Sequence, residues 1–400
     1  MLTRTPFVPP AALESLRRQQ QVGREKLGVY HALSRGDVLA QSLARADARE
    51  GAATAEDGWI YSNGMRFPEA TERTRWARTR AIISRTQPGT DEDPKYLEMT
   101  ARQLASIEML LRADHTDAPD ARMAEICDRI LLGTSPALVP DALARRVGDH
   151  FIVLVSFGLI DFCYQSAKAS VLSWKPIPAP DGVAFSFRNE AAHVDEVLAA
   201  DPSPLRLFQS TLEAFLFEGL PRAVSNAPPA ANYQAPLGIL TNANERFILA
   251  HEVGHTLHDA LDIVPADGTA VAEELAVDDF AFYAVVESGH RFDALPPNFS
   301  AQGAYFVLTA LEVIRQALDL ARHGEVREDH GFVGHPPVAR RLQALRQRYL
   351  ATVSDRDDDL WIEPALSPAR TLQQLWDRVI ANGAAERWRG RTVHRIWAGV

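Results

Sequence analysis

The stretch RFILAHEVGHTLHDALD, residues 246–262, places His251 and His255 four positions apart with Glu252 between them. On a helix, two such histidines lie about 40° apart around the axis and one turn apart along it, so both imidazoles can reach a single ion. A zinc site that activates water needs such ligands and a nearby carboxylate that accepts the proton of the water. The motif therefore predicts a metal-binding helix with Glu252 as a general base. An amphipathic helix that carries two histidines by chance is the alternative.

The next helical pattern, TAVAEELAVDDFAFYAVVESG at 269–289, offers the third ligand that such a site requires. The intervening DIVPADG segment is typical of a short reversal, which would return this helix against the first. Glu274 is then the preferred ligand, and Glu273 would point to another side. Asp278 shares a helix face with Glu274 and is expected to accept the spare ring N–H of a ligand histidine. An acidic, solvated helix start is the alternative.

Three stretches together resemble zinc metallopeptidases of the gluzincin type: HEVGH, then ELAVDDFA at 274–281, then GHPPVARRLQAL at 334–345. The pattern of these enzymes is HExxH, a downstream Glu with Asp or Asn four residues on, and in several branches a later His-Pro-x-x-x-x-Arg segment. The branches to compare are the CaaX-type membrane endopeptidases, the soluble ImmA/IrrE peptidases and the phage-exclusion Lit-type peptidases. The resemblance covers roughly residues 240–350, and the first 150 residues resemble none of them.

The resemblance implies one Zn²⁺ per chain, held by His251, His255 and Glu274. It also implies Glu252 as general base and Asp278 as the residue that orients a ligand histidine. The membrane branch has spanning helices that this chain lacks, which favours the soluble branches. The ligand set also suits manganese, iron or cobalt, so the choice of zinc is part of what the resemblance implies.

A hydrogen-bond donor must meet the negative charge that develops on the carbonyl oxygen during peptide hydrolysis. The candidates are His335, His330, Tyr283 and Tyr305, and no spacing selects among them. His335 is the preferred catalytic donor, because it lies in the segment from 335 to 340 that resembles the His-Pro pattern of the metallopeptidases. A His-Pro-Pro sequence that simply begins a helix is the alternative.

Composition predicts a folded, soluble, cytoplasmic protein. The chain has 400 residues, 46% of them hydrophobic, and its longest apolar run, 151–160, is too short to span a bilayer. The net charge of −10 argues against general nucleic-acid binding, and the arginine-rich segment 66–85 is expected to form a solvated helix face. The two cysteines, Cys127 and Cys163, lie far apart in apolar stretches and indicate neither a disulfide framework nor a cysteine metal site.

The fold is expected to be mainly α, in the α+β class, with a zincin-like metallopeptidase core that contains a small sheet and an active-site helix. Residues 1–145 would form a helical region of unknown role, 146–353 the core, and 354–400 a helical extension. The active-site helix is expected to begin at Asn242, with Glu245 completing a capping box. Further helices are expected at 93–114, 120–133, 269–289, 300–324 and 367–383, strands of one small sheet at 152–155 and 182–190, and a proline-rich loop at 223–238.

The predicted function is zinc-dependent hydrolysis of peptide bonds in a protein or peptide substrate, with a regulatory or phage-defence role. The alternative is a non-catalytic binding or scaffold protein stabilised by its metal. Water in the fourth coordination position would favour the enzyme, whereas a fourth protein ligand would favour the scaffold. The substrate and the oligomeric state stay open.

Overall fold

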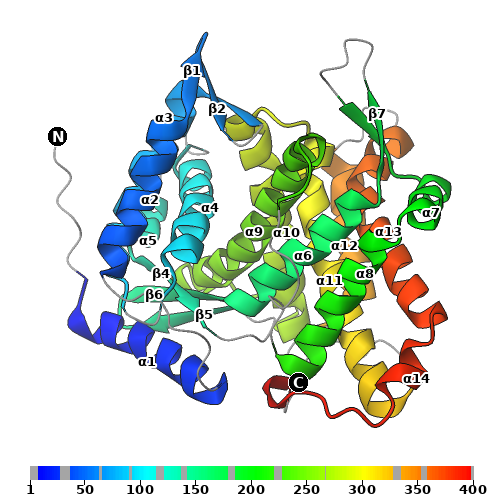
Figure 1. The fold of residues 1–400 in the computed structure, drawn as a ribbon. Helices are drawn as coiled ribbons and strands as arrows, with labels where there is room; N and C mark the ends of the chain where they lie inside the picture. Colours follow the sequence, from blue (N-terminus) through cyan, green and yellow to red (C-terminus); the bar gives the residue numbers. More distant parts are fainter. Residues whose placement is uncertain are drawn as a thin grey trace.

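The computed structural model describes residues 8–27, 37–62, 65–89, 92–113, 121–136, 142–178, 185–219, 228–265, 267–327, 335–352 and 358–397. This part of the chain is mainly helical with small sheets, as the sequence predicts (Figure 1). Its α-helices are α1 (Pro10–Leu27), α2 (Val38–Ala52), α3 (Glu69–Thr86), α4 (Pro94–Ala113), α5 (Ala121–Asp128), α6 (Phe157–Leu172), α7 (Ala191–Ala200), α8 (Ser203–Glu213), α9 (Ala231–Ala260), α10 (Ala270–Asp293), α11 (Pro297–His323), α12 (Val338–Thr352), α13 (Asp358–Ala381) and α14 (Ala384–Trp388). A π-turn, Ala214–Glu218, follows α8, and a 3₁₀ turn, Arg395–Trp397, ends the described chain.

The central sheet has the strand order β4-β6-β5, with β4 (Ile130–Ser135) parallel and β5 (Ala142–Val147) antiparallel to β6 (His150–Ser156). Helix α1 covers one face of this sheet, at the lower left of Figure 1, and the main core covers the other. The two other sheets in the described residues are smaller. They consist of β1 (Thr54–Glu56), β2 (Trp59–Ser62) and β3 (Met65–Pro68), and of β7 (Lys175–Pro178) with β8 (Phe185–Arg188).

The sequence prediction around the central sheet was partly wrong. The helix expected at 120–133 ends at Asp128, and the rest of that range is the start of β4. Every residue of β4 is buried because both faces of the sheet are covered, and a fully buried strand shows no alternation that separates it from a buried helix. The strands expected at 152–155 and 182–190 do form, as β6 and β8, but they lie in different sheets.

Helix α9 begins eleven residues before the expected Asn242 and contains Pro236. The capping-box prediction is therefore wrong: Asn242 lies inside the helix, where its Oδ1 accepts a hydrogen bond from Gln103 Nε2 at 3.0 Å. Burial of Leu237 and Leu240 explains why packing overrides the local proline signal. Much of the expected loop at 223–238 is thus helical, and its first part, 223–227, lies outside the described residues.

The arginine-rich segment 66–85 covers most of strand β3 and helix α3, and the expectation of a solvated helix face is wrong for two arginines of α3. Arg75 is only 1% exposed, and it donates to Glu72 at 2.7 Å and to Asp293 of α10 at 2.5 Å. Arg85 is also buried and donates to Glu108 and, at 2.8 Å, to the carbonyl of Ile130. Buried charges persist where partners of this kind satisfy them, so these arginines join α3 to the core.

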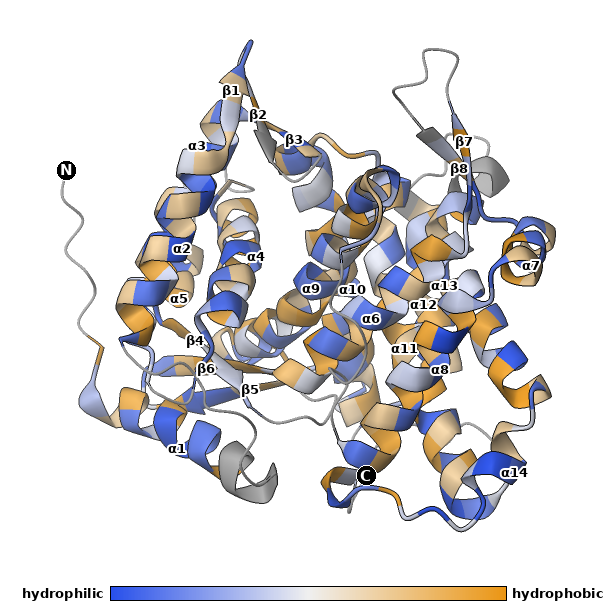
Figure 2. Ribbon diagram, in the orientation of Figure 1, coloured by the Kyte–Doolittle hydropathy of each residue, from blue (hydrophilic) through white to orange (hydrophobic). Residues whose placement is uncertain are grey.

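A continuous hydrophobic cluster runs from Ile82 in α3 to Trp397 and contains residues of all three predicted parts. The close approach of α11 to α9 depends on Gly303, where a Cβ atom would lie 2.3 Å from the backbone carbon of Ala243. Figure 2 shows orange and blue residues alternating along α2, as an amphipathic outer helix requires. The division at 145 and 353 stays a prediction.

The C-terminal helix α13 begins at Asp358, earlier than expected, and continues through Pro364 and Pro368. Its Trp376 is fully buried and donates from Nε1 to Gln316 Oε1 of α11 at 2.6 Å, which fixes the two helices against each other. Among the described residues, no helix has both the length and the apolar composition that crossing a bilayer requires.

Candidate metal centre

Helix α9 carries His251 and His255 one turn apart, with ring centroids 4.9 Å from each other. Both Nε2 atoms face the same carboxylate on α10: His251 Nε2 lies 3.6 Å from Glu274 Oε2, and His255 Nε2 lies 3.3 Å from Glu274 Oε1. The two histidines and the glutamate expected from the sequence are therefore neighbours in space. Metal ligands of this type converge in the same way.

The close packing of α10 on α9 depends on Gly254, which stands between the two histidines. A Cβ atom at this position would lie 2.9 Å from Val277 Cγ1 and 3.2 Å from Phe280 Cδ1. Helix α10 is capped at Thr269, whose side chain accepts a hydrogen bond from the backbone N–H of Ala272 at 3.1 Å. Gly254 on α9 and the Thr269 cap on α10 thus determine how close Glu274 lies to the histidines and in which direction it points.

Asp278 contacts His251 as the sequence predicts, with 3.0 Å between His251 Nδ1 and Asp278 Oδ1. The same carboxylate accepts two hydrogen bonds from Arg341 of α12, from Nε at 2.6 Å and from Nη2 at 2.7 Å. Burial alone would raise the pKa of Asp278, but the hydrogen bonds from Arg341 and His251 outweigh it and lower this pKa. An ionised Asp278 holds the proton of His251 on Nδ1 and leaves Nε2 as the ligand atom.

The pKa values of the two histidines shift in opposite directions. Burial lowers the pKa of His251, with Asp278 opposing, so its imidazole is neutral at pH 7 and has the form that binds metals. Burial also acts to lower the pKa of His255, but the hydrogen bond with Glu274 and the charge of Glu252 outweigh it and raise the pKa to about 9. His255 must therefore release a proton before it can bind a metal.

The sequence predicts that Glu273 points to another side, and this prediction is wrong: Glu273 lies at the site. Its Oε1 lies 3.3 Å from His255 Nδ1, so it holds His255 in the way that Asp278 holds His251. Adjacent residues on a helix lie about 100° apart, and the reach of the Glu273 side chain spans this difference. Each histidine of the motif thus has its own orienting carboxylate, and Glu274 lies between them.

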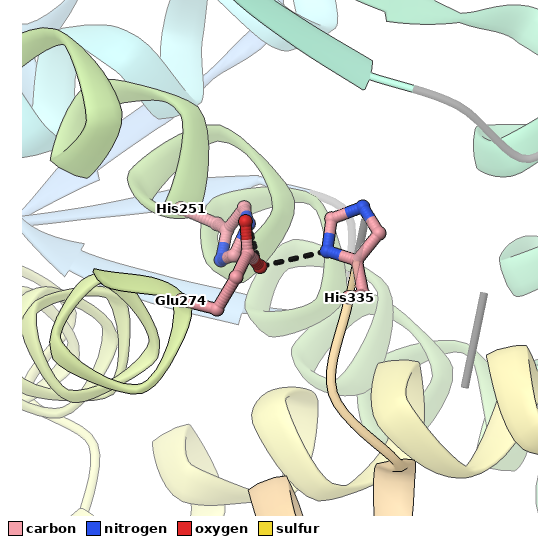
Figure 3. A group of neighbouring side chains, drawn as sticks. All are labelled: His251, Glu274 and His335. Carbon is pink, nitrogen blue, oxygen red and sulfur yellow. Dashed lines mark hydrogen bonds and ion pairs between the residues drawn. The ribbon is translucent and has the colours of Figure 1, made fainter. Parts of the chain in front are cut away.

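His335 comes from the opposite side of the site, directly before α12, and Figure 3 shows its ring facing Glu274. Its Nδ1 lies 2.7 Å from Glu274 Oε2. One ligand atom from each of His251, Glu274 and His335 lies within 4.8 Å of the others, which makes this trio a possible metal cluster in its own right. The structure thus brings together four groups of metal-ligand type, one more than the three ligands expected.

The other residues considered as donors were His330, Tyr305 and Tyr283. His330 is outside the described residues. Tyr305 is buried in the hydrophobic cluster, and burial raises the pKa of its hydroxyl. Tyr283 packs against the same cluster. Of the four candidates, His335 contacts a ligand residue, Glu274.

Glu252 and His335 share a cleft of about 340 Å³ with His255 and strand β5. Glu252 is 6% exposed, so it is shielded from bulk water while still lining the cleft. The cysteines lie outside this cleft, and burial raises the pKa of each thiol to about 12, which keeps both in the form that does not bind metals.

Arg341 is the residue that the sequence reading missed. The His-Pro-x-x-x-x-Arg pattern ends at Arg341, and Arg341 is buried on Asp278 whereas Arg340 is exposed. Counting the pattern from His335 would have selected Arg341. Glu273 had no such signal, because an acidic residue in the first turn of a helix is common.

Comparisons with protein-family models, with curated proteins and with solved structures found no match for this chain. The resemblance to gluzincin metallopeptidases therefore stays a prediction from HEVGH and the two stretches after it.

Proposed function

We propose that the chain is a zinc-dependent peptidase, in which His251, His255 and Glu274 hold the metal. The observation that carries the proposal is the convergence of both His Nε2 atoms on Glu274, with one of these histidines, His255, lining a cleft together with Glu252. These donors fit zinc, since two imidazoles and one carboxylate leave the fourth position for water, as in hydrolytic zinc sites. We further propose that α9, α10 and the central sheet form a zincin-like core.

The chemistry that zinc supplies when bound in such a site is polarisation of the scissile carbonyl and a lowered pKa for the attacking water. Glu252 accepts the proton that this water loses and delivers it to the departing amine as the peptide C–N bond breaks. His335 donates a hydrogen bond to the carbonyl oxygen while negative charge develops there. Because its Nδ1 contacts the Glu274 carboxylate, its Nε2 can be this donor only when the ring carries a hydrogen on both nitrogens.

Strand β5 gives the cleft a wall that suits an extended peptide. Val147 and His150 flank a two-residue turn, and in such a hairpin the closing pair is hydrogen-bonded. By alternation Arg145 and Leu143 also bond to β6, and the backbone N–H and C=O groups of the remaining β5 residues point away from it. A substrate that adds as a further strand would satisfy these groups and place its peptide bonds beside Glu252.

We expect acidic substrate residues opposite Arg145 to favour cleavage. Arg145 is exposed, lines the cleft and forms no ion pair with a described residue, whereas neighbouring Arg146 contacts Asp259 at 3.3 Å. A cross-strand pair of opposite charges contributes about 0.2–1 kcal/mol, so kcat/KM should rise up to about fivefold over a neutral residue. A digest of a proteome-derived peptide library, read by mass spectrometry of the new termini, measures this preference.

In that experiment Arg145→Glu should reverse the preference towards basic residues, while Arg18→Glu, an exposed position on α1, should leave it unchanged. Cleavage with the same preference in Arg145→Glu would remove Arg145 from substrate recognition. It would leave the peptidase proposal intact.

The scaffold alternative has one observation in its favour, which is the proximity of His335 to the ligand atoms of His251 and Glu274. If His335 were a fourth protein ligand, the site would be closed and structural. His335→Ala separates the two functions. If His335 is a catalytic donor, its loss should lower hydrolysis about 10²–10³-fold with zinc content unchanged. If His335 is a ligand, its loss should lower the zinc content itself. Elemental analysis measures this content beside the exposed control His323→Ala.

A further inference from the structure

A second cavity, of about 1110 Å³, lies between α2, α4, α6 and α9. Its lining shares no residue with the metal cleft, although both use helix α9. Its buried wall residues with side-chain oxygens include Glu98, Asp161, Gln165 and Glu245. Such a set of acceptors in one cavity has no role in the proposed hydrolysis.

Two of these residues present a buried oxygen that has neither a hydrogen-bond partner nor an ion-pair partner within the described part of the chain. Glu245 is 92% buried, its carboxylate accepts a hydrogen bond from Gln103, and its Oε2 is buried with no hydrogen-bond partner. Gln165 is 98% buried, and its Oε1 is likewise without a partner. A buried acceptor without a donor is destabilising, and more so when it is charged. Burial, reinforced by the charge of Glu98, raises the pKa of Glu245 to about 7, with Gln103, Arg49 and Lys95 opposing.

The other two carboxylates have partners, although Glu98 Oε2 is in an ion pair and accepts no well-aligned hydrogen bond. Asp161 accepts a hydrogen bond from the hydroxyl of Tyr96, and Glu98 Oε2 lies 3.0 Å from Arg49 Nε. A donor that enters the cavity would therefore be directed to Glu245 and Gln165. Because Glu245 can be anionic and Asp161 and Glu98 add negative charge around it, a cationic donor is favoured over a neutral one.

The rim of the cavity has the opposite charge. Arg45 and Lys95 line the cavity from α2 and α4, are exposed, and form no ion pair with any residue that the structure describes. A polyamine, which is cationic along its whole length, would meet repulsion at these two residues. A molecule with a carboxylate at one end and an amine at the other matches both regions.

We propose that this cavity binds a small zwitterion, a free amino acid or ω-amino acid, with its ammonium group against Glu245 and Gln165 and its carboxylate at Arg45 and Lys95. The binding requires no metal and does not depend on the peptidase proposal. The volume also accepts longer molecules of the same polarity, such as a short peptide.

The test uses three probes of equal chain length: 6-aminohexanoate, n-hexylamine and hexanoate. Isothermal titration of the full chain, with zinc or with chelator, should show binding of 6-aminohexanoate, weaker binding of hexylamine and none of hexanoate. Glu245→Gln should weaken 6-aminohexanoate about 10–100-fold, because a charge-assisted hydrogen bond contributes about 1.5–3 kcal/mol. Arg45→Ala combined with Lys95→Ala should make 6-aminohexanoate and hexylamine bind equally.

The matched control is Glu14→Gln, an exposed carboxylate on α1 that should leave all three affinities unchanged. Glu245→Gln should also fold well, since it removes a buried ionisable group and keeps the hydrogen bond from Gln103, and Gln165→Ala offers a second variant that should weaken the amine end. The proposal is overturned if no probe binds, if hexanoate binds as well as 6-aminohexanoate, or if both variants at the deep end leave binding unchanged.

Discussion

Glu252→Gln is expected to retain the fold and the zinc content of the wild-type protein while hydrolysis falls by about 10²–10⁴-fold, the usual contribution of a general base. Glutamine has nearly the same shape as glutamate and fits the buried position beside the cleft. It cannot accept the proton of the attacking water at neutral pH. The peptide library provides the assay, since it presents many different sequences to the cleft at once.

The control for this variant is Glu325→Gln, which removes an exposed carboxylate after α11 and should leave cleavage unchanged. Zinc content and the melting temperature are measured on both variants, so that loss of metal or of fold is not mistaken for loss of the base. Undiminished cleavage by Glu252→Gln, with zinc bound, would exclude Glu252 from the mechanism. Absence of cleavage by the wild type over the whole library, with zinc bound, would favour the scaffold.

The parts of the site that the sequence predicted are those encoded by spacing along one helix. His251 and His255 share a face because they are four residues apart, and the same spacing brings Asp278 onto the face of Glu274. The cap at Thr269 set the start of α10, so the direction of Glu274 towards α9 followed from local signals. Each of these features arises from residues that are close together in the chain.

The parts that the sequence did not reveal depend on distant packing. Arg341 reaches Asp278 across 63 positions of the chain, and only the packing of α12 on α10 decides that Arg341 is buried and Arg340 is not. The start of α9 was missed for a similar reason: Asn242 is bonded to Gln103 of α4, a residue 139 positions away, so it does not act as a local cap. The hydrophobic periodicity of the sequence also did not reveal that β4 is buried under α1.

The second prediction with a large expected effect concerns the zinc content of the protein. We expect about one zinc per wild-type chain by elemental analysis, and loss of that zinc in both His255→Ala and Glu274→Ala, because each removes a ligand from a site with few. His258→Ala is the matched control: it lies on α9 one turn beyond His255, but the hydrogen bonds and ion pairs of the described structure do not connect it to Glu274. This variant should keep its zinc.

The residues around the ligands predict a graded response that an accidental histidine pair would not show. Asp278→Asn should lower zinc affinity about 10–100-fold, as the loss of an orienting carboxylate does elsewhere, whereas Asp279→Asn, which breaks only an exposed pair with Arg348, should not. Affinity should also rise with pH up to about 9, because the raised pKa of His255 means that protons compete with the metal below that value.

A wild-type protein that takes up no zinc under replete conditions would make HEVGH an ordinary helix face. Zinc that survives in His255→Ala and Glu274→Ala would place the metal elsewhere. Loss of zinc in these two variants and weaker zinc binding in Asp278→Asn, with unchanged binding in His258→Ala and Asp279→Asn, is the pattern that the contacts between α9, α10 and α12 require.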